Sequence, residues 1–229
     1  MKQVYLDNAA TTPLAPEVAG AMIPVLTDVF GNPSSSHATG RKAKALVETS
    51  RRDIASQLGC EPKSIIFTSG GTEADNLAFR SAVKDLDCER IITSPAEHSA
   101  VIASAEKMST LFGVKLEHVK HNEDASVDLV HLEEILSEGP KTLVSLMHAN
   151  NEIGVIQPLD KISALCIKYD AIFHSDTVQT MGHYPFSLDS LEIDYLTCSA
   201  HKFHGPKGTG FLYAHPKNKI RSQIVGGGQ

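Results

Sequence analysis

The sequence predicts an α/β fold, a mostly parallel sheet flanked by helices in three layers (α/β/α). Short apolar runs of strand length alternate with longer segments in which apolar residues recur at helical spacing. This alternation is typical of β-α units whose sheet is buried on both faces. The chain has 229 residues, 41% of them hydrophobic, which is enough for one large domain with a substantial core.

Each expected element follows from its pattern, with strands taken from apolar runs and helices from the helical period. In chain order we expect helices at 16–29 and 41–58, a strand at 64–68, a helix at 72–86, a strand at 90–94, a helix at 99–111, a strand at 115–119, a helix at 128–136, a strand at 142–147, a helix at 158–169, and strands at 171–175, 194–198 and 210–214.

The overall charge limits the classes of partner. A formal net charge of −6 provides no positive excess for binding nucleic acid or an anionic membrane. No apolar stretch resembles a signal peptide or a membrane span, so we expect a cytoplasmic protein. The four widely spaced cysteines are expected to be reduced thiols, and no histidine pair has the neighbours of a zinc motif, so no metal is expected.

Lys202 lies just beyond an apolar strand, in the segment SAHKFHGPKG (199–208). A lysine that bonds to an aldehyde must be partly neutral, which requires burial or nearby positive charge. A solvated loop lysine is the alternative.

Asp176 ends another expected strand, in HSDTVQ (174–179). A buried carboxylate of this kind can keep the ring nitrogen of pyridoxal 5'-phosphate (PLP) protonated. The alternative is an N-cap for the following turn.

A third segment, TSGGTEADN (68–76), joins a strand to a helix start. Gly71 allows close backbone approach, free amides at the helix start point at an anion, and the Thr72 hydroxyl adds a donor. A capping box would have much the same sequence. His98 and the segment NNEIG (150–154) follow two further strands at the same sheet edge, where ligands of α/β sheets bind, although His98 is also placed to cap a helix.

Together these segments resemble the cysteine desulfurases of the NifS/IscS type, which are fold-type I PLP enzymes of the class V aminotransferases. The matching motifs are, in order, LDNAATTP (6–13), GNPS (31–34), SGGTE (69–73), EH (97–98), NNEIG (150–154), HSDTVQ (174–179) and SAHK (199–202). The resemblance covers the whole chain and is specific when the motifs are taken jointly.

The resemblance implies a role for each matched residue. Lys202 would be the Schiff-base lysine and would also take the Cα proton of L-cysteine, Asp176 would pair with the ring nitrogen, and His98 would stack on the ring. Gln179 and Asn151 would lie near the phenolic oxygen and the substrate. The phosphate would be held by Gly71, Thr72, Ser199 and His201. The products would be L-alanine and an enzyme persulfide, for iron-sulfur cluster assembly or other sulfur transfer, and a homodimer with a sulfur-acceptor or scaffold protein is implied.

The family's persulfide-forming cysteine lies further downstream, in a small domain that this sequence lacks. The glycine run at 226–228 reads as a junction at which the chain is cut. We therefore expect residues 1–15 to be a segment that packs on the absent small domain, and residues 16–229 to be the PLP-binding large domain. Cys198 is expected to be an inert core thiol and no substitute nucleophile, so these residues alone are expected to be incomplete for turnover.

Three other functions remain open at this stage. A selenocysteine lyase would use the same cofactor residues, and an aminotransferase of the same superfamily would need no enzyme cysteine. A non-catalytic scaffold would have little need to retain Lys202, Asp176 and His98 together.

Overall fold

Seven strands form one sheet in the computed structural model, which describes residues 4–188, 190–218 and 220–226. The strands are β1 (Ile65–Thr68), β2 (Arg90–Thr93), β3 (Lys115–His118), β4 (Thr142–Ser145), β5 (Ile172–Asp176), β6 (Tyr195–Ser199) and β7 (Gly210–Ala214). Their order across the sheet is β1-β7-β6-β5-β4-β2-β3. Strand β7 runs antiparallel to β1 and β6, and every other pair is parallel, so the predicted mostly parallel sheet is confirmed.

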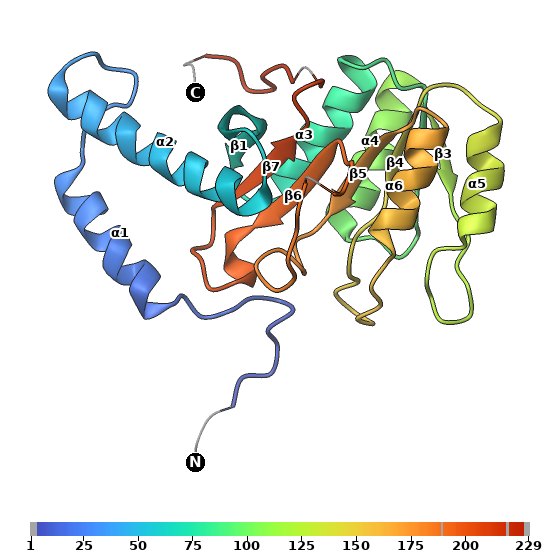
Figure 1. Cartoon of the computed structure of the whole chain (residues 1–229), viewed down its shortest axis with the longest axis horizontal. Helices are drawn as coiled ribbons and strands as arrows, with labels where there is room; N and C mark the ends of the chain where they lie inside the picture. The colour runs from blue at the N-terminus through green and yellow to red at the C-terminus, as the bar shows by residue number, and fades with distance from the viewer. Residues whose placement is uncertain (1–3, 189, 219, 227–229) are drawn as a thin grey trace.

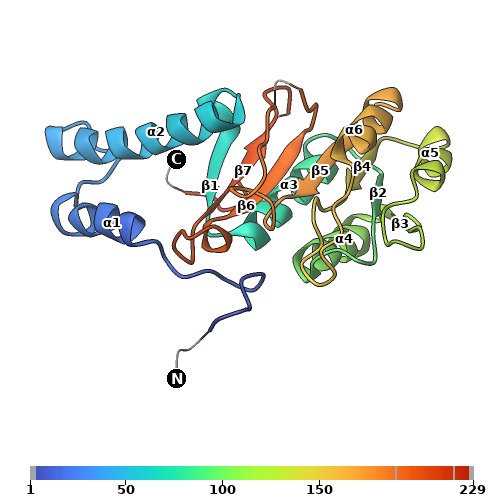
Figure 2. The ribbon, with the colours of Figure 1, turned by 60° about the horizontal axis from the view of Figure 1, so that its bottom comes forward.

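Helices cover both faces of this sheet (Figures 1 and 2). The six helices described are α1 (Pro16–Asp28), α2 (Ala38–Leu58), α3 (Gly71–Lys84), α4 (Ser99–Phe112), α5 (Leu129–Ser137) and α6 (Leu159–Lys168). Side chains of α3 and α4 pack in one core cluster, and those of α2, α5 and α6 pack in another. The two clusters lie on opposite faces, because neighbouring strand residues such as Ile91 and Ile92 fall in different ones.

The predicted elements are confirmed with small shifts at their ends. Helix α2 begins at Ala38, three residues before the expected start, because the His37 ring accepts a hydrogen bond from the Gly40 amide and caps the helix. Its other end is closed by Gly59 in the left-handed conformation, with φ at 71°. Strand β4 ends at Ser145, two residues before the expected end.

The sheet brings several loops to one edge. Strands β1, β2, β4, β5 and β6 all run in the same direction, so the segments that follow them leave from the same edge of the sheet. The N-terminal segment reaches this edge too, since the Thr12 amide donates to the His201 carbonyl and the Ala15 amide to the His204 carbonyl. In the described part of the chain, no helix is both long and apolar enough to cross a membrane.

Candidate functional site

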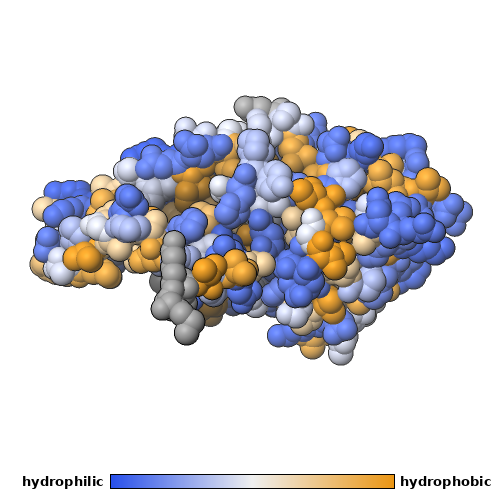
Figure 3. Space-filling view, turned by 90° about the horizontal axis from the view of Figure 1, so that it is seen from below, coloured by the Kyte–Doolittle hydropathy of each residue, from blue (hydrophilic) through white to orange (hydrophobic). Residues whose placement is uncertain are grey.

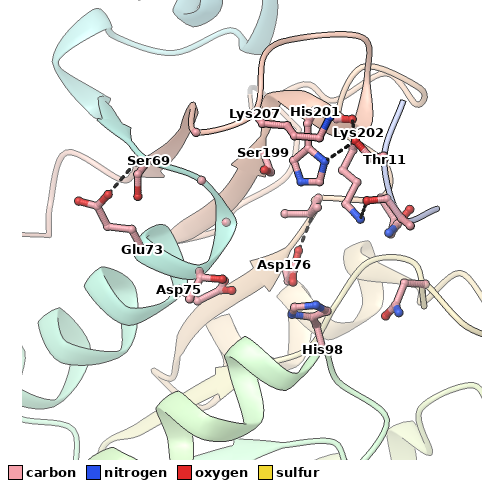
Figure 4. Close-up of a pocket in the computed structure, with 18 of the residues that line it drawn as sticks. Thr11, Ser69, Glu73, Asp75, His98, Asp176, Ser199, His201, Lys202 and Lys207 are labelled. Atoms are coloured by element: carbon pink, nitrogen blue, oxygen red, sulfur yellow. Dashed lines mark hydrogen bonds between the residues drawn. The ribbon is translucent and has the colours of Figure 1, made fainter. Parts of the chain in front are cut away.

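A cavity of about 620 Å³ opens at the edge where these strand ends meet. All nine residues expected at the site line this cavity, namely Gly71, Thr72, His98, Asn151, Asp176, Gln179, Ser199, His201 and Lys202. They come from segments spread over more than 130 positions of the chain. Figure 4 shows the side chains of five of them around one space, namely His98, Asp176, Ser199, His201 and Lys202. The cavity also exposes the start of α3 on one side and the N-terminal segment on the other.

Lys202 ends a short 3-10 turn (Ala200–Lys202) directly after β6. Its Nζ donates hydrogen bonds to two carbonyls of the N-terminal segment, those of Ala9 and Ala10, the latter at 2.9 Å. Burial lowers the pKa of this amine, while the negative charges of Asp176 and Asp7 act in the opposite direction. The half-buried amine thus gains a neutral fraction, which a nucleophilic lysine requires.

Asp176 is the last residue of β5 and is 5% exposed. Its Oδ1 accepts a hydrogen bond from the Val178 amide at 2.9 Å, so it also caps the turn, as the alternative interpretation had it. The pKa of this carboxyl is raised to about 7, first by burial and then by the nearby charge of Asp75, while the Val178 amide, His174 and His98 act in the opposite direction. A cation placed in the cavity would therefore favour ionised Asp176.

The start of α3 forms an anion cradle. Gly70 precedes the helix with φ at 151° and ψ at −173°, a conformation that essentially only glycine adopts. A Cβ on Gly71 would lie 2.9 Å from Cγ2 of Val178, so this position also needs glycine. Glu73 accepts a hydrogen bond from the Ser69 amide at 2.7 Å, one residue before the N-cap Gly70, so the capping box that the sequence left open is not formed. The remaining amides of the first turn face the cavity without a side-chain cap.

Ser199 and His201 flank the same cradle from the end of β6. Ser199 is 4% exposed, and its Oγ lies 3.6 Å from where a Cβ on Gly70 would be. His201 Nδ1 lies 3.0 Å from the Thr11 hydroxyl. Burial lowers the pKa of His201, and Lys202 and Lys207 lower it further, so this imidazole is a neutral hydrogen-bonding group.

His98 caps α4 and still faces the cavity. Its Nδ1 accepts a hydrogen bond from the Ala100 amide at 3.2 Å, which confirms the capping interpretation. The side chain is nonetheless exposed and lies beside Asp176 in Figure 4. Its ring face is therefore available to a planar ligand.

Asn151 and Gln179 also line the cavity. Asn151 Nδ2 donates to Glu152 at 2.8 Å, and Gln179 Nε2 donates to the Ala9 carbonyl at 2.9 Å. Gln179 therefore links the N-terminal segment to the cavity wall, where its side chain can also reach a ligand.

Sequence reasoning assigned no role to several residues that line the cavity. These are Ala10, Thr11, Ser69, Gly70, Glu73, Asp75, Met147, Val178, Lys207 and Gly208. Most lie inside the motifs already quoted, so their position in those motifs was the available signal. Asp75 lies in the quoted segment 68–76 too, but nothing indicated its burial, because an acidic residue in the first turns of a helix ordinarily faces solvent.

The residues around the cavity fit PLP in charge and in chemistry. The cradle supplies amide and hydroxyl donors for a phosphate, Asp176 supplies a carboxylate for a protonated ring nitrogen, and Lys202 supplies an amine for the aldehyde. The glycines leave room for close approach, since any side chain at 70 or 71 would be strained or crowded.

The four cysteines are free thiols, and none of them is among the cavity residues described above. Cys88, Cys166 and Cys198 are buried, as expected for Cys198, and burial raises the pKa of each thiol. Burial also raises the pKa of Cys60, which is partly exposed, to about 11. All four are therefore poor thiolates near neutral pH. The described residues include no cluster of side chains suited to a metal ion.

Known proteins with the same architecture were found by sequence and by structure. A cysteine desulfurase IscS of Dictyoglomus turgidum is 44% identical over 230 residues, covering 100% of this chain and 58% of that protein. A solved NifS-like protein superposes with a TM-score of 0.94 at 40% identity, covering 100% of this chain and 63% of its own. A solved structure titled SspA in complex with cysteine superposes with a TM-score of 0.92 at 34% identity, covering 99% of this chain and 66% of its own. The chain thus spans less than two thirds of the length of these relatives.

The fold and the site define a class of protein, a three-layer α/β protein with a lysine, a buried carboxylate and an anion cradle at one sheet edge. The family model described as Aminotransferase class-V matches residues 4–229. The chain belongs to that family, whose members depend on PLP, and the predicted resemblance is confirmed.

Proposed function

We propose that the protein containing this chain is a PLP-dependent cysteine desulfurase, which converts L-cysteine to L-alanine and passes the sulfur to an enzyme thiol as a persulfide. The observation that carries the proposal is the convergence of Lys202, Asp176 and the α3 cradle on one cavity. The named relatives support cysteine as the substrate, because the matched IscS is called a cysteine desulfurase and the SspA structure is titled as a cysteine complex.

Each site residue would then act through its own chemistry. Lys202 would hold the cofactor covalently, and its free amine would serve as the base that accepts the Cα proton. Asp176 would hold the ring proton, and His98 would support the ring face. When bound, the cofactor withdraws electrons from the substrate Cα. Gly71, Thr72, Ser199 and His201 would hold the phosphate, while Asn151 and Gln179 orient the phenolic oxygen and the substrate.

The sulfur-accepting thiol would come from outside the four cysteines of this chain, since these are buried or hold their protons tightly. Formally, cysteine and an enzyme thiol give alanine and an enzyme persulfide, with one sulfur atom transferred and no external oxidant. We also propose a cytoplasmic location, a homodimer, and a sulfur-acceptor or scaffold protein as partner.

The test is product analysis with the purified full-length protein supplied with PLP and L-cysteine. We expect alanine and protein-bound persulfide in equal amounts, and loss of both in Lys202→Ala. A keto acid instead of alanine would overturn the proposal in favour of an aminotransferase. Turnover of selenocysteine without turnover of cysteine would assign a selenocysteine lyase.

A further inference from the structure

Asp75 is a buried carboxylate at the wall of the cavity that the proposed reaction does not use. It lies in the second turn of α3, is 1% exposed and borders the same cavity as Asp176 (Figure 4). Among the residues that the structure describes, none forms a hydrogen bond with its Oδ1. A buried, incompletely paired carboxylate is expensive for a fold and calls for a reason.

Asp75 is connected to the strand that carries Asp176. His174, two residues before Asp176 on β5, is fully buried, and its Nε2 lies 3.4 Å from Oδ1 of Asp75 and 3.0 Å from the Thr197 hydroxyl. Its Nδ1 lies 2.8 Å from the Ser145 hydroxyl. Burial lowers the pKa of His174 to about 4, so the ring is neutral and its contact with Asp75 is no ion pair.

The protons of this network can be placed from its donors and acceptors. Ser145 donates to Nδ1 of His174, Nε2 of His174 donates to Thr197, and the Thr197 hydroxyl is then free to donate to Asp75. In this arrangement every shared proton is directed toward Asp75. The network therefore favours the ionised form of Asp75, against the cost of its burial.

We propose that Asp75 is a positioning residue of the cofactor site: its negative charge, held through Thr197 and His174, strengthens the hold of Asp176 on the proton of a bound ring nitrogen. The inference rests on the proposed PLP site. Two carboxylates at one buried wall repel each other when the cavity lacks a cation, and a protonated ring relieves that repulsion. The site would thereby prefer a protonated pyridine to an uncharged ring.

The other titratable groups that face this pair are Glu97, His98, His174 and Lys202. Glu97 is buried, and its burial and the charges of Asp176 and Asp75 raise its pKa well above its usual range. Glu97 is present in both the wild type and the Asp75 variant. His98 and Lys202 act on Asp176 from the cavity side and are unchanged by a substitution at Asp75.

The test follows the ring nitrogen itself. The full-length protein is loaded with PLP carrying ¹⁵N in the ring, and the ¹⁵N chemical shift is recorded against pH, which distinguishes a protonated from an unprotonated ring. In Asp75→Asn we expect the ring to lose its proton at a pH lower by about one unit or more than in the wild type. Asp53→Asn, the same change at an exposed position of α2, is the control and should match the wild type.

A second variant keeps the test decisive if Asp75→Asn does not fold. Thr197→Val removes the hydroxyl that supports ionised Asp75, so we expect a shift in the same direction but smaller. Profiles of the folded variants that coincide with the wild type would overturn the role of Asp75 and leave the PLP site intact. A wild-type protein that takes up no PLP would overturn both.

Discussion

Single buried charges dominate the behaviour of this site at the scale of the residue. Asp75 and Asp176 are both nearly inaccessible, and burial raises the pKa of each carboxyl to about 7. Because ionising them is costly, the cofactor-free protein should be less stable where both are charged. Cofactor binding should therefore stabilise the fold by more than its contacts alone would suggest.

The pH dependence of stability follows from the sign of the shift at Asp75. The pKa of Asp75 in the folded protein is raised above the ordinary value. Its contribution to the free energy of unfolding is therefore fully present below about pH 4 and is lost as the pH rises through about 7. Asp75→Asn should remove that loss. Relative to the wild type, the variant should gain roughly 2–4 kcal/mol of unfolding free energy between pH 4 and pH 8.

Urea unfolding of the cofactor-free proteins at several pH values measures this difference. His174 has its pKa lowered from 6.5 to about 4, so its burial costs stability as the pH falls through this range. This contribution is present in both proteins and cancels in the difference between their unfolding free energies. Asp53→Asn should show no such gain. Parallel curves for the wild type and Asp75→Asn would refute a raised pKa at Asp75.

Residue types at strand ends made most of the site predictable. Lys202, Asp176 and His98 follow strands, and the directions of the strands bring them to one edge. Asp75 was not predictable, because its burial depends on β5 and β6 packing against α3, with His174 and Thr197 beyond it. The contacts of Lys202 with Ala9 and Ala10 join residues more than 190 positions apart, and no local pattern encodes them.

At the scale of the element, the turn from β1 into α3 is the most constrained segment of the site. Gly70 holds its backbone in a region that only glycine occupies readily, and this conformation aims the first amides of α3 at the cavity. The sequence indicated the cradle but left a simple capping box open. The turn is glycine-based, and Glu73 bonds the Ser69 amide, which precedes the N-cap Gly70, so no capping box is formed.

Gly70→Ala should weaken PLP binding at least tenfold and cost about 1–3 kcal/mol of stability, because alanine is strained at this φ. Fluorescence titration with PLP and thermal unfolding measure the two effects. Gly20→Ala is the matched control, since a Cβ there meets nothing within 4 Å and the helix interior of α1 favours alanine. Equal PLP affinity in the two variants would rule out the cradle.

The sheet itself was predictable in its strands but not in their order. All seven strands were located in the sequence, most of them because buried strands are rich in apolar residues, although the edge strand β3 is half-buried or exposed. The insertion of antiparallel β7 between β1 and β6 depends on long-range pairing, such as Leu196 with Tyr213, that no local pattern reveals.

At the scale of the whole molecule, α1 and α2 extend from one end of the sheet (Figure 1). Both helices expose apolar side chains. Helix α1 has no buried residue, and Ile23, Leu26 and Phe30 are 60%, 76% and 85% exposed. Figure 3 shows apolar surface at that end of the molecule. An exposed apolar face of this kind indicates a covering partner, and the proposed homodimer would supply one.

The proposed homodimer predicts twice the monomer mass for the full-length protein in light scattering. Leu26→Glu places a charge in the exposed face and should shift the protein toward monomer by tenfold or more in dissociation constant. Val130→Glu is the control, because Val130 is 70% exposed on α5 at the far end of the sheet. A monomeric wild type would contradict the proposed dimer.

Covalent attachment of the cofactor to Lys202 can be measured in one experiment. The protein is incubated with PLP, reduced with borohydride, digested and mapped by mass spectrometry. We expect one reduced PLP per chain, on Lys202. An adduct on Lys207, the other lysine that lines the cavity, or no adduct at all, would contradict it.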